Sequence, residues 1–211
     1  MTTQLATLPP TADIVVIGGG FAGAATAAAL VRLGCRDVVI LEAEDQFGMH
    51  ASGLNASMAR HLDEDPVLTR LATEGIASMR NNDAWPRQPV DHLDTGSLLL
   101  LDRAKGHPMA AAAQAMISIG CRVLDRDETI AMVPLLADAD FAAAIHTPGD
   151  GWVDIHALLW RYLNTARLGG ARLVTACQVR QVLTEQGRVI GVRTNRGIVS
   201  CQTVVNAAGA W

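Results

Sequence analysis

The chain begins its patterned region with a short apolar run, then small residues, then a longer apolar stretch. Residues 14–17 (IVVI) are all β-branched, which is typical of a strand buried on both faces of a parallel sheet. Three glycines follow at 18–20, and an alanine-rich segment continues to about Leu33. Because consecutive glycines disfavour a continuous helix, the uncharged stretch 14–31 is predicted to form strand, turn and helix rather than a membrane span. A second apolar run, 38–41 (VVIL), predicts the next strand.

Further along, apolar spacing predicts a helix from Asp65 through Trp85. Asp65 is a suitable N-cap and Pro66 a suitable first residue. Leu68, Leu71 and Met79 would form the apolar face of this helix. The Pro-rich cluster at 86–89 ends the pattern and predicts a domain crossing.

The remaining chain alternates between predicted strands and helices. Strands are expected at 97–101, 121–124 and 141–147, and within 171–205, where turns are expected at 185–187 and 195–197. Helices are expected at about 108–119, near Asp127, and after Asp154, where Leu158, Leu159, Tyr162, Leu163 and Ala166 give an apolar face.

Composition narrows the class of protein. Of 211 residues, 50% are hydrophobic and 18% charged, which is typical of a folded globular chain. A net charge of −4 without a basic cluster argues against nucleic-acid binding. Four cysteines without a CxxC pair, and a start without a signal-peptide pattern, predict reduced thiols and a cytoplasmic protein.

The first glycines have the spacing of a dinucleotide-binding turn, Gly18-x-Gly20-x-x-Gly23, between a predicted strand and a predicted helix. In this motif the first glycine permits a tight turn, the second lets the backbone approach a pyrophosphate, and the third lets helix and strand pack closely. The N-terminus of the helix then directs free N–H groups at the phosphates. A purely structural βαβ turn is the alternative interpretation.

An acidic residue is expected where the second strand ends, within reach of a ribose hydroxyl. Glu42 occupies this position, whereas Glu44 and Asp45 lie beyond the apolar run and are expected to be solvated. The motif alone fits NAD or FAD, and the alternative of an NAD(P)-dependent dehydrogenase stays open here. The following segment, QFGMHASGLNASMAR (46–60), is rich in small and hydroxyl residues that suit a pyrophosphate or the edge of a flavin.

Together these motifs resemble the D-amino-acid oxidase family of FAD-dependent oxidoreductases, which includes glycine oxidase, sarcosine oxidase and D-amino-acid dehydrogenases. The similar blocks are DIVVIGGGFAG with Ala27 and Gly34, then VVILEAE, then GMHASGLNAS, all within residues 13–58. Two later blocks also resemble the family, GDGWVDIHALLWRYLNTARLGGARL (149–173) and TVVNAAGAW (203–211). The resemblance implies an α/β protein, a Rossmann-like FAD-binding domain with a parallel sheet and a β-meander, plus an incomplete α+β substrate domain.

The resemblance also implies which residues contact FAD. The pyrophosphate would face the glycine turn (18–23), and the adenosine would face the end of the second strand. The small-residue loop (within 46–60) would run beneath the pyrophosphate toward the flavin. One later strand would bracket the adenine, and the final turn would lie against the cofactor. In that order the residues are Gly18, Gly20, Ala22 and Gly23; Glu42 and Ala43; Ala51, Ser52, Gly53, Asn55, Ala56, Ser57 and Met58; Val179; and Ala208 and Gly209.

The activity implied is oxidation of an amine or amino acid by hydride transfer to flavin. The implied domains are 1–85 and 148–211 for FAD and 86–147 for substrate. Family members continue well past the NAAGAW block, and that part carries the arginine that binds the substrate carboxylate. We therefore expect a truncated chain, a subunit of a split enzyme with a partner chain, or a non-catalytic FAD-binding fragment. No catalytic residue is nominated, since choosing Arg60 or Arg103 has no basis in the sequence.

The histidines give weaker signals. His50 lies in the small-residue loop and is interpreted as a hydrogen-bonded loop residue, with a position near the flavin as the alternative. His61 with Asp63, Glu64 and Asp65 suggests a metal, but a solvated helix start is the favoured interpretation, and no metal site is expected. His146 and His156 are expected to be structural.

Overall fold

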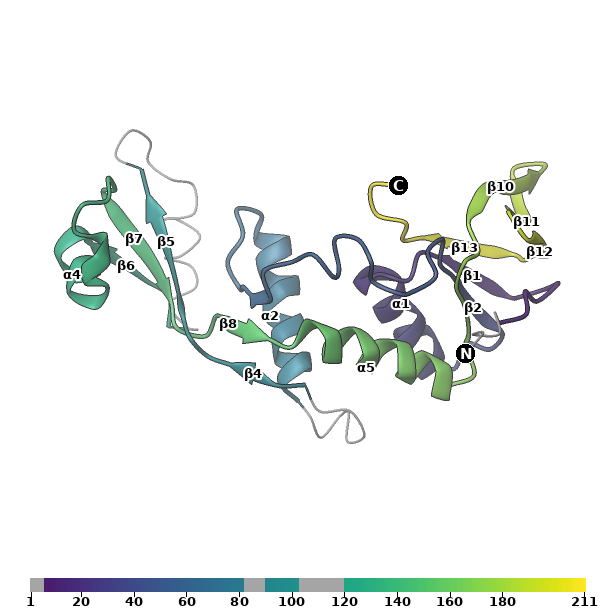
Figure 1. Ribbon diagram of the computed structural model, residues 1–211, viewed down its shortest axis with the longest axis horizontal. Coiled ribbons are helices and arrows are strands. Elements are labelled where there is room, and N and C mark those ends of the chain that lie inside the picture. Colours follow the sequence, from purple (N-terminus) through teal and green to yellow (C-terminus); the bar gives the residue numbers. More distant parts are fainter. Residues whose placement is uncertain (1–5, 82–89, 103–119) are drawn as a thin grey trace. The chain divides into compact units, whose positions relative to one another are not determined.

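The computed structural model describes residues 6–81, 90–102 and 120–211 (Figure 1). The chain divides into two compact units, Met1–Ala56 with Ile155–Trp211, and Ser57–Asp154. The domain bounds expected from the sequence (1–85, 86–147 and 148–211) differ from this division and stay a prediction. The expected helix at 108–119, the Pro-rich cluster at 86–89 and Trp85 lie outside the described residues.

The first unit is organised around a parallel sheet whose strand order is β13-β1-β2-β9. Its strands are β1 (Ile14–Ile17), β2 (Val38–Leu41), β9 (Arg172–Val174) and β13 (Thr203–Asn206). Helix α1 (Phe21–Arg32) connects β1 to β2. Ile14 pairs with Val38 on one side and with Thr203 on the other, so β1 is an inner strand. The predicted strand, turn and helix are confirmed.

Both faces of this sheet are covered, because successive strand residues point to opposite sides. Val15 and Val16 are both fully buried, in two different apolar clusters. On the Val16 side, alanines of α1 pack with Leu159 and Leu163 of α5 (Ile155–Leu168). On the Val15 side, the cluster includes Val192 of the meander described next. The uninterrupted β-branched run in β1 follows from this two-sided burial.

An antiparallel meander completes the first unit, with strands β10 (Val179–Glu185), β11 (Arg188–Thr194) and β12 (Gly197–Ser200). Gln186 and Gly187 join the first pair and both have positive φ, 49° and 76°, as a two-residue type I′ hairpin requires. The predicted turn at 185–187 is confirmed. The neighbouring Cys201 is buried, and burial raises the pKa of its thiol, which makes it an inert core residue.

The second unit contains two small antiparallel sheets. One has the order β3-β8-β4 and the other β5-β7-β6. Their strands are β3 (Met58–Ala59), β4 (His92–Leu93), β5 (Ser97–Leu101), β6 (Arg122–Asp125), β7 (Ala143–Thr147) and β8 (Gly151–Val153). The described helices of this unit are α2 (Pro66–Arg80), α4 (Arg126–Met132) and the 3-10 turn η3 (Pro134–Leu136). The predicted fold class, mixed α/β with a parallel sheet and antiparallel sheets, is confirmed.

Helix α2 begins as predicted but buries a different face. Asp65 caps it by accepting a hydrogen bond from Val67 N at 2.7 Å. Its buried residues are Thr69, Ile76 and Met79, whereas Leu68 and Leu71 are 50% and 54% exposed. The expected apolar face was therefore wrong for both leucines.

Thr69 can occupy the buried face of α2 in place of the leucines because its hydroxyl keeps its hydrogen bonds when buried. It donates to Asp63 O and accepts from Asp63 N, each at 3.0 Å, which ties the helix start to the preceding segment. The helix ends at Arg80, before the end predicted at Trp85.

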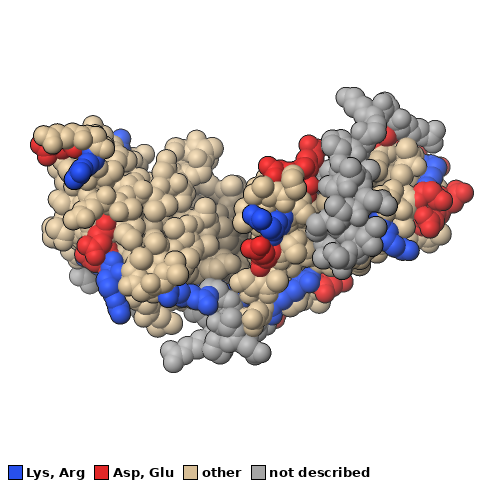
Figure 2. Space-filling view, turned by 180° about the vertical axis from the view of Figure 1, so that it is seen from behind, with Lys and Arg blue, Asp and Glu red and all other residues tan. Residues whose placement is uncertain are grey.

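Two surface observations bear on the excluded classes. Among the described residues, no helix is long and apolar enough to span a membrane. Figure 2 shows Lys and Arg interspersed in small groups with Asp and Glu on the face in view, rather than gathered in a basic patch.

Candidate cofactor site

The glycine turn of the first unit has no room for side chains at its key positions. Gly18 has a φ of +97°, and a Cβ there would lie 2.5 Å from the carbonyl oxygen of Ala207. A Cβ on Gly23 would lie 1.9 Å from the carbonyl oxygen of Gly18. The first glycine therefore permits the tight turn, and the third permits close packing of α1 on β1, as the sequence predicts.

Gly19, which the motif leaves unspecified, is constrained by a neighbouring side chain rather than by backbone. A Cβ there would lie 2.1 Å from the Phe47 ring, and the Gly19 N–H donates to Glu42 Oε2 at 2.7 Å. Sequence reasoning missed this residue because the spacing rule names only three glycines. The run of three consecutive glycines was the available signal.

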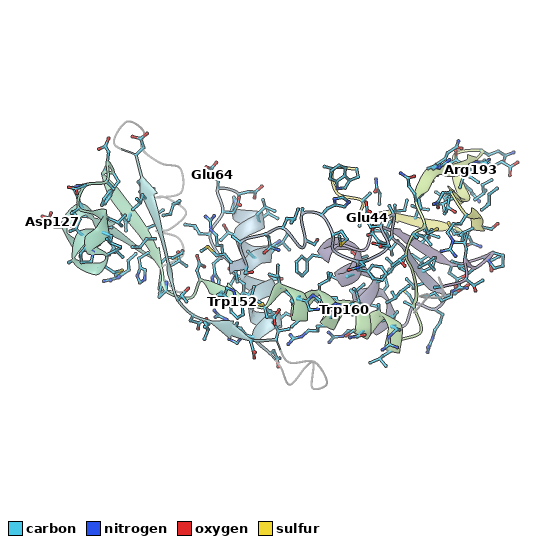
Figure 3. All side chains as sticks on the ribbon, in the orientation of Figure 1. Glu44, Glu64, Asp127, Trp152, Trp160 and Arg193 are labelled. Atoms are coloured by element: carbon cyan, nitrogen blue, oxygen red, sulfur yellow. The ribbon has the colours of Figure 1, made fainter. Side chains whose placement is uncertain are left out.

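Glu42 lies at the carboxyl end of β2 and is only 8% exposed. Its Oε2 accepts from Gly19 N, and its Oε1 accepts from Glu44 N at 2.9 Å. A carboxylate has about four lone-pair sites, so two backbone bonds leave capacity for ribose hydroxyls. The two rival acids differ. Asp45 is exposed, and Glu44, which Figure 3 labels, is hydrogen-bonded through its carboxylate to the His50 ring.

Ser52 connects the small-residue loop to the start of α1. Its hydroxyl accepts a hydrogen bond from Phe21 N at 2.9 Å. This matters because the N-cap of α1 is Gly20, which has no side chain to satisfy a free N–H. The loop is further closed by the Asn55 side chain, which donates to Ser52 O at 2.8 Å. Residues 51–56 are thereby positioned beside the helix N-terminus.

Two distant segments reach the same end of the sheet. Cys177 N donates to Glu42 O at 2.8 Å, which brings the segment before Val179 alongside the end of β2. Ala207 N donates to Ile17 O at 2.9 Å, which sets Ala208 and Gly209 beside the glycine turn. Because β1, β2 and β13 are parallel, their carboxyl ends meet at one edge, where open α/β sheets bind ligands.

His50 is hydrogen-bonded, as the favoured interpretation predicts. Its Nε2 lies 3.0 Å from Glu44 Oε1, and both side chains are nearly half exposed. Its ring centroid lies 4.6 Å from that of Trp211, at an interplanar angle of 39°. Whether this histidine also lies near a flavin stays a prediction.

The similarity of the chain to known protein families identifies its family. Residues 13–211 match the family described as "FAD dependent oxidoreductase". The chain belongs to this family. That match confirms the predicted resemblance and FAD as the cofactor of the family.

Relatives of this FAD-dependent oxidoreductase family match nearly the whole chain. Human mitochondrial sarcosine dehydrogenase is 29% identical over 97% of it, and the mouse mitochondrial regulatory subunit of pyruvate dehydrogenase phosphatase is 26% identical over 97%. Among solved structures, L-proline dehydrogenase from P. horikoshii has a TM-score of 0.81 at 27% identity over 97% of the chain. Glycine oxidase from Bacillus cereus has a TM-score of 0.74 at 25% identity over 95%.

The chain covers only part of these relatives. It spans 23% and 24% of the lengths of the human and mouse proteins. It spans 54% and 56% of the two solved chains.

The first unit of this family member fits the cofactor. Backbone N–H groups at the start of α1, a buried carboxylate at the end of β2, and the turn after β13 meet at one sheet edge. These groups suit a pyrophosphate and a ribose. Ser57 and Met58, also predicted to contact FAD, belong to the second unit, where Met58 begins β3. Their contact with the cofactor stays a prediction.

The second unit holds a side-chain cluster that sequence reasoning missed. His61 is 6% exposed, and its Nδ1 lies 2.7 Å from Asp150 Oδ1, which also accepts from His61 N at 2.8 Å. Ser97 Oγ donates to Asp150 Oδ2 at 2.6 Å. The sequence analysis interpreted His61, Asp63, Glu64 and Asp65 together as a solvated helix start. That interpretation is wrong for His61, which is buried, and right for the three acids, which are exposed.

The structure also bears on the metal site and on the arginines considered in the sequence analysis. In the described ranges, no group of three His, Cys, Asp or Glu side chains is arranged to hold a metal ion. Of the two arginines considered for substrate, Arg60 is exposed, and Arg103 lies outside the described residues. No catalytic residue is assigned.

Proposed function

We propose that this chain forms the FAD-binding part of an FAD-dependent oxidoreductase that oxidises an amine or an amino acid. One observation carries the proposal: the glycine turn, Glu42 and the turn after β13 converge at one edge of the sheet. The family match over residues 13–211 supports it. FAD, when bound, supplies the electron acceptor for oxidation of the substrate C–N bond.

The residues of the chain would hold and orient this cofactor. Gly18, Gly20, Ala22 and Gly23 would leave the backbone free to face the pyrophosphate, while Glu42 would accept hydrogen bonds from ribose hydroxyls. The remaining contacts follow the resemblance. Ala43 and Val179 would lie toward the adenosine, and Ala208 and Gly209 beside the cofactor. The residues that would run beneath the pyrophosphate toward the flavin are Ala51, Ser52, Gly53, Asn55, Ala56, Ser57 and Met58.

The substrate class follows from what the relatives are named for. Sarcosine, L-proline and glycine are all small amines that carry a carboxylate. We therefore propose a substrate of this kind, and a partner chain or further sequence as the source of the groups that bind and orient it. Cytoplasmic localisation is part of the same proposal.

A second candidate function is a non-catalytic, FAD-binding role. It is supported by the mouse relative, which is named a regulatory subunit and is 26% identical over 97% of this chain. The two functions share the cofactor site and differ only in whether substrate reduces it.

The experiment that separates them is a visible absorption spectrum of the purified protein, with and without added FAD, followed by anaerobic addition of sarcosine, L-proline or glycine. A flavin spectrum that bleaches with one of these amines supports the oxidoreductase. A flavin spectrum that none of them changes, even after supplementation with a partner chain, supports the non-catalytic role. Protein that fails to bind FAD, or binds NAD instead, overturns both.

A further inference from the structure

The glycine turn and the segment after β2 meet at one aromatic side chain of the first unit. Gly19 is buried, and a Cβ on it would lie 2.1 Å from Cδ1 and 2.7 Å from Cε1 of Phe47. Gly18 has a φ of +97°, whereas Gly19 is not among the glycines with positive φ. The backbone conformation at position 19 therefore does not itself require glycine. The Phe47 ring is the structural reason for a glycine there.

The space beside Gly19 also borders the carboxylate of Glu42. The Cβ position that would meet the Phe47 ring lies 3.1 Å from Glu42 Oε2. Ring and carboxylate oxygen therefore flank one point, next to the hydrogen bond that Gly19 N donates to Oε2 at 2.7 Å. Glu42 is only 8% exposed, and a hydrogen bond is stronger where water is excluded. By filling the space beside this bond, the ring helps to keep water out.

The apolar core supports Phe47 on its other side. The ring is partly buried and packs on the cluster that contains Val16 and Ile40. The next residue, Gly48, has a φ of +75°, and a Cβ there would lie 2.4 Å from Leu159 Cδ2. The chain directly after Phe47 therefore packs closely against α5, which limits the positions that the ring can take.

The orientation of the Glu42 carboxylate depends on the spacing of two segments. Its Oε2 accepts from Gly19 N in the glycine turn, and its Oε1 accepts from Glu44 N in the segment after β2 (Figure 3 labels Glu44). Both bonds can form together only if these segments stay at a fixed separation. Phe47 belongs to the second segment and contacts the first, so its ring acts as the spacer between them.

We propose that Phe47 is a positioning residue for the adenosine ribose of FAD. Its ring, as a spacer beside Gly19, holds Glu42 in the orientation that accepts hydrogen bonds from the ribose hydroxyls. Phe47 would act through Glu42 rather than by contact with the cofactor. The inference rests on the proposed FAD function and adds to it the residue that keeps the ribose-binding carboxylate in place.

The first test compares the affinities of the full chain for FAD and for its 2′-deoxyadenosine analogue, measured by flavin fluorescence titration. The parent should favour FAD about tenfold, because the analogue lacks a hydroxyl that donates to Glu42. Phe47→Leu keeps an apolar side chain but removes the ring beside Gly19, and should reduce this preference to about threefold or less. A role in packing alone would weaken both ligands equally and leave the preference unchanged.

Leu30→Ala is the matched control for packing. Leu30 is partly buried against the same apolar cluster, but it lies in the last turns of α1, away from the glycine turn. Its loss should leave the preference for FAD over the analogue at the value of the parent, whatever it does to stability.

A second test needs no flavin. Gly19→Ala should lower the midpoint of urea denaturation, because the new Cβ overlaps the Phe47 ring. In a Phe47→Ala background the same substitution should lower the midpoint clearly less, since the ring is gone. This non-additivity is the signature of two positions in direct contact.

Several results would overturn the positioning role. They are an unchanged preference for FAD in Phe47→Leu, an equal loss of preference in Leu30→Ala, and an equal cost of Gly19→Ala with and without the ring. A parent that binds FAD and the analogue equally would also overturn it, because Glu42 would then make no bond for Phe47 to position. A parent that binds no FAD overturns the proposed function too, and is recognised by its spectrum before any variant is compared.

Discussion

In the first unit, the candidate site is made mostly of main chain: three consecutive glycines, the N–H groups of a helix start, and the turn after β13. In the second unit, the His61 cluster is made of side chains that meet across 89 positions of sequence. A site made of backbone groups needs positions without side chains. Glycines at a fixed spacing reveal such positions in the local sequence. A site made of side chains needs partners that only the fold brings together, so no local sequence pattern predicts it.

This difference also determines how each site fails. Adding atoms should damage the first site, because a Cβ on Gly18 or Gly23 would overlap a backbone carbonyl oxygen. Removing atoms should damage the second, because its buried polar groups would lose the hydrogen bonds that they make with one another. Substitutions that add or remove one group in each unit therefore test the comparison.

The largest effect is expected for Gly23→Ala. The new Cβ would lie 1.9 Å from the carbonyl oxygen of Gly18, so α1 must move away from β1. We expect the free energy of unfolding to fall by about 3 kcal/mol, the upper part of the range for overpacked sites. Urea denaturation followed by circular dichroism measures this. An unchanged midpoint would mean that the turn tolerates a side chain and that the motif is less constrained than described.

Asp150→Ala should have the next largest effect. Asp150 is 1% exposed and accepts three hydrogen bonds, two from His61 and one from Ser97. Leaving these donors unsatisfied should lower the free energy of unfolding by about 2 kcal/mol. The same denaturation experiment applies, with Asp127→Ala as control, since Asp127 is exposed on α4 and its loss should cost less than about 0.5 kcal/mol. Equal effects of the two substitutions would show that the cluster adds nothing to stability.

Glu42→Ala tests the chemistry of the first unit rather than its packing. Loss of the carboxylate removes a charge-assisted partner for ribose and frees the Gly19 N–H. FAD binding should weaken about tenfold, equivalent to about 1.4 kcal/mol. Flavin fluorescence titration measures the affinity. Asp45→Ala is the matched control and should leave it unchanged. If Asp45→Ala weakens binding as much as Glu42→Ala, the ribose end has been placed on the wrong acid.

The smallest effect is expected for Gly75→Ala, and its sign is opposite. Gly75 is exposed within α2, and nothing lies within 4 Å of a Cβ at this position. Alanine is the better helix former, so the free energy of unfolding should rise by about 1 kcal/mol. A thermal melt next to that of Gly23→Ala gives a direct contrast. Destabilisation by Gly75→Ala would reveal a constraint on α2 that the described contacts do not contain.

The sequence predicted β1, β2 and the start of α2 well, because each depends on local chemistry. β-branched runs between glycines and an Asp-Pro cap need no knowledge of distant residues. It also predicted correctly that Glu42 follows the end of the second strand, since the apolar run that ends there is local too. It failed for Leu68 and Leu71 because Thr69 finds its partners in Asp63, which no periodicity rule includes. It failed for His61 for the same reason, because the partner is Asp150.

The register of the parallel sheet has a consequence for synthesis of the protein. The neighbour of inner strand β1 in the sheet, β13, is synthesised almost 190 positions after it, with Ile14 against Thr203. Until then one side of β1 has exposed main-chain groups that could pair with another chain. Such long-range pairing is slow to form, and nascent intermediates that lack it are prone to aggregate. The need for chaperones during translation should therefore depend on the time that passes between synthesis of β1 and synthesis of β13.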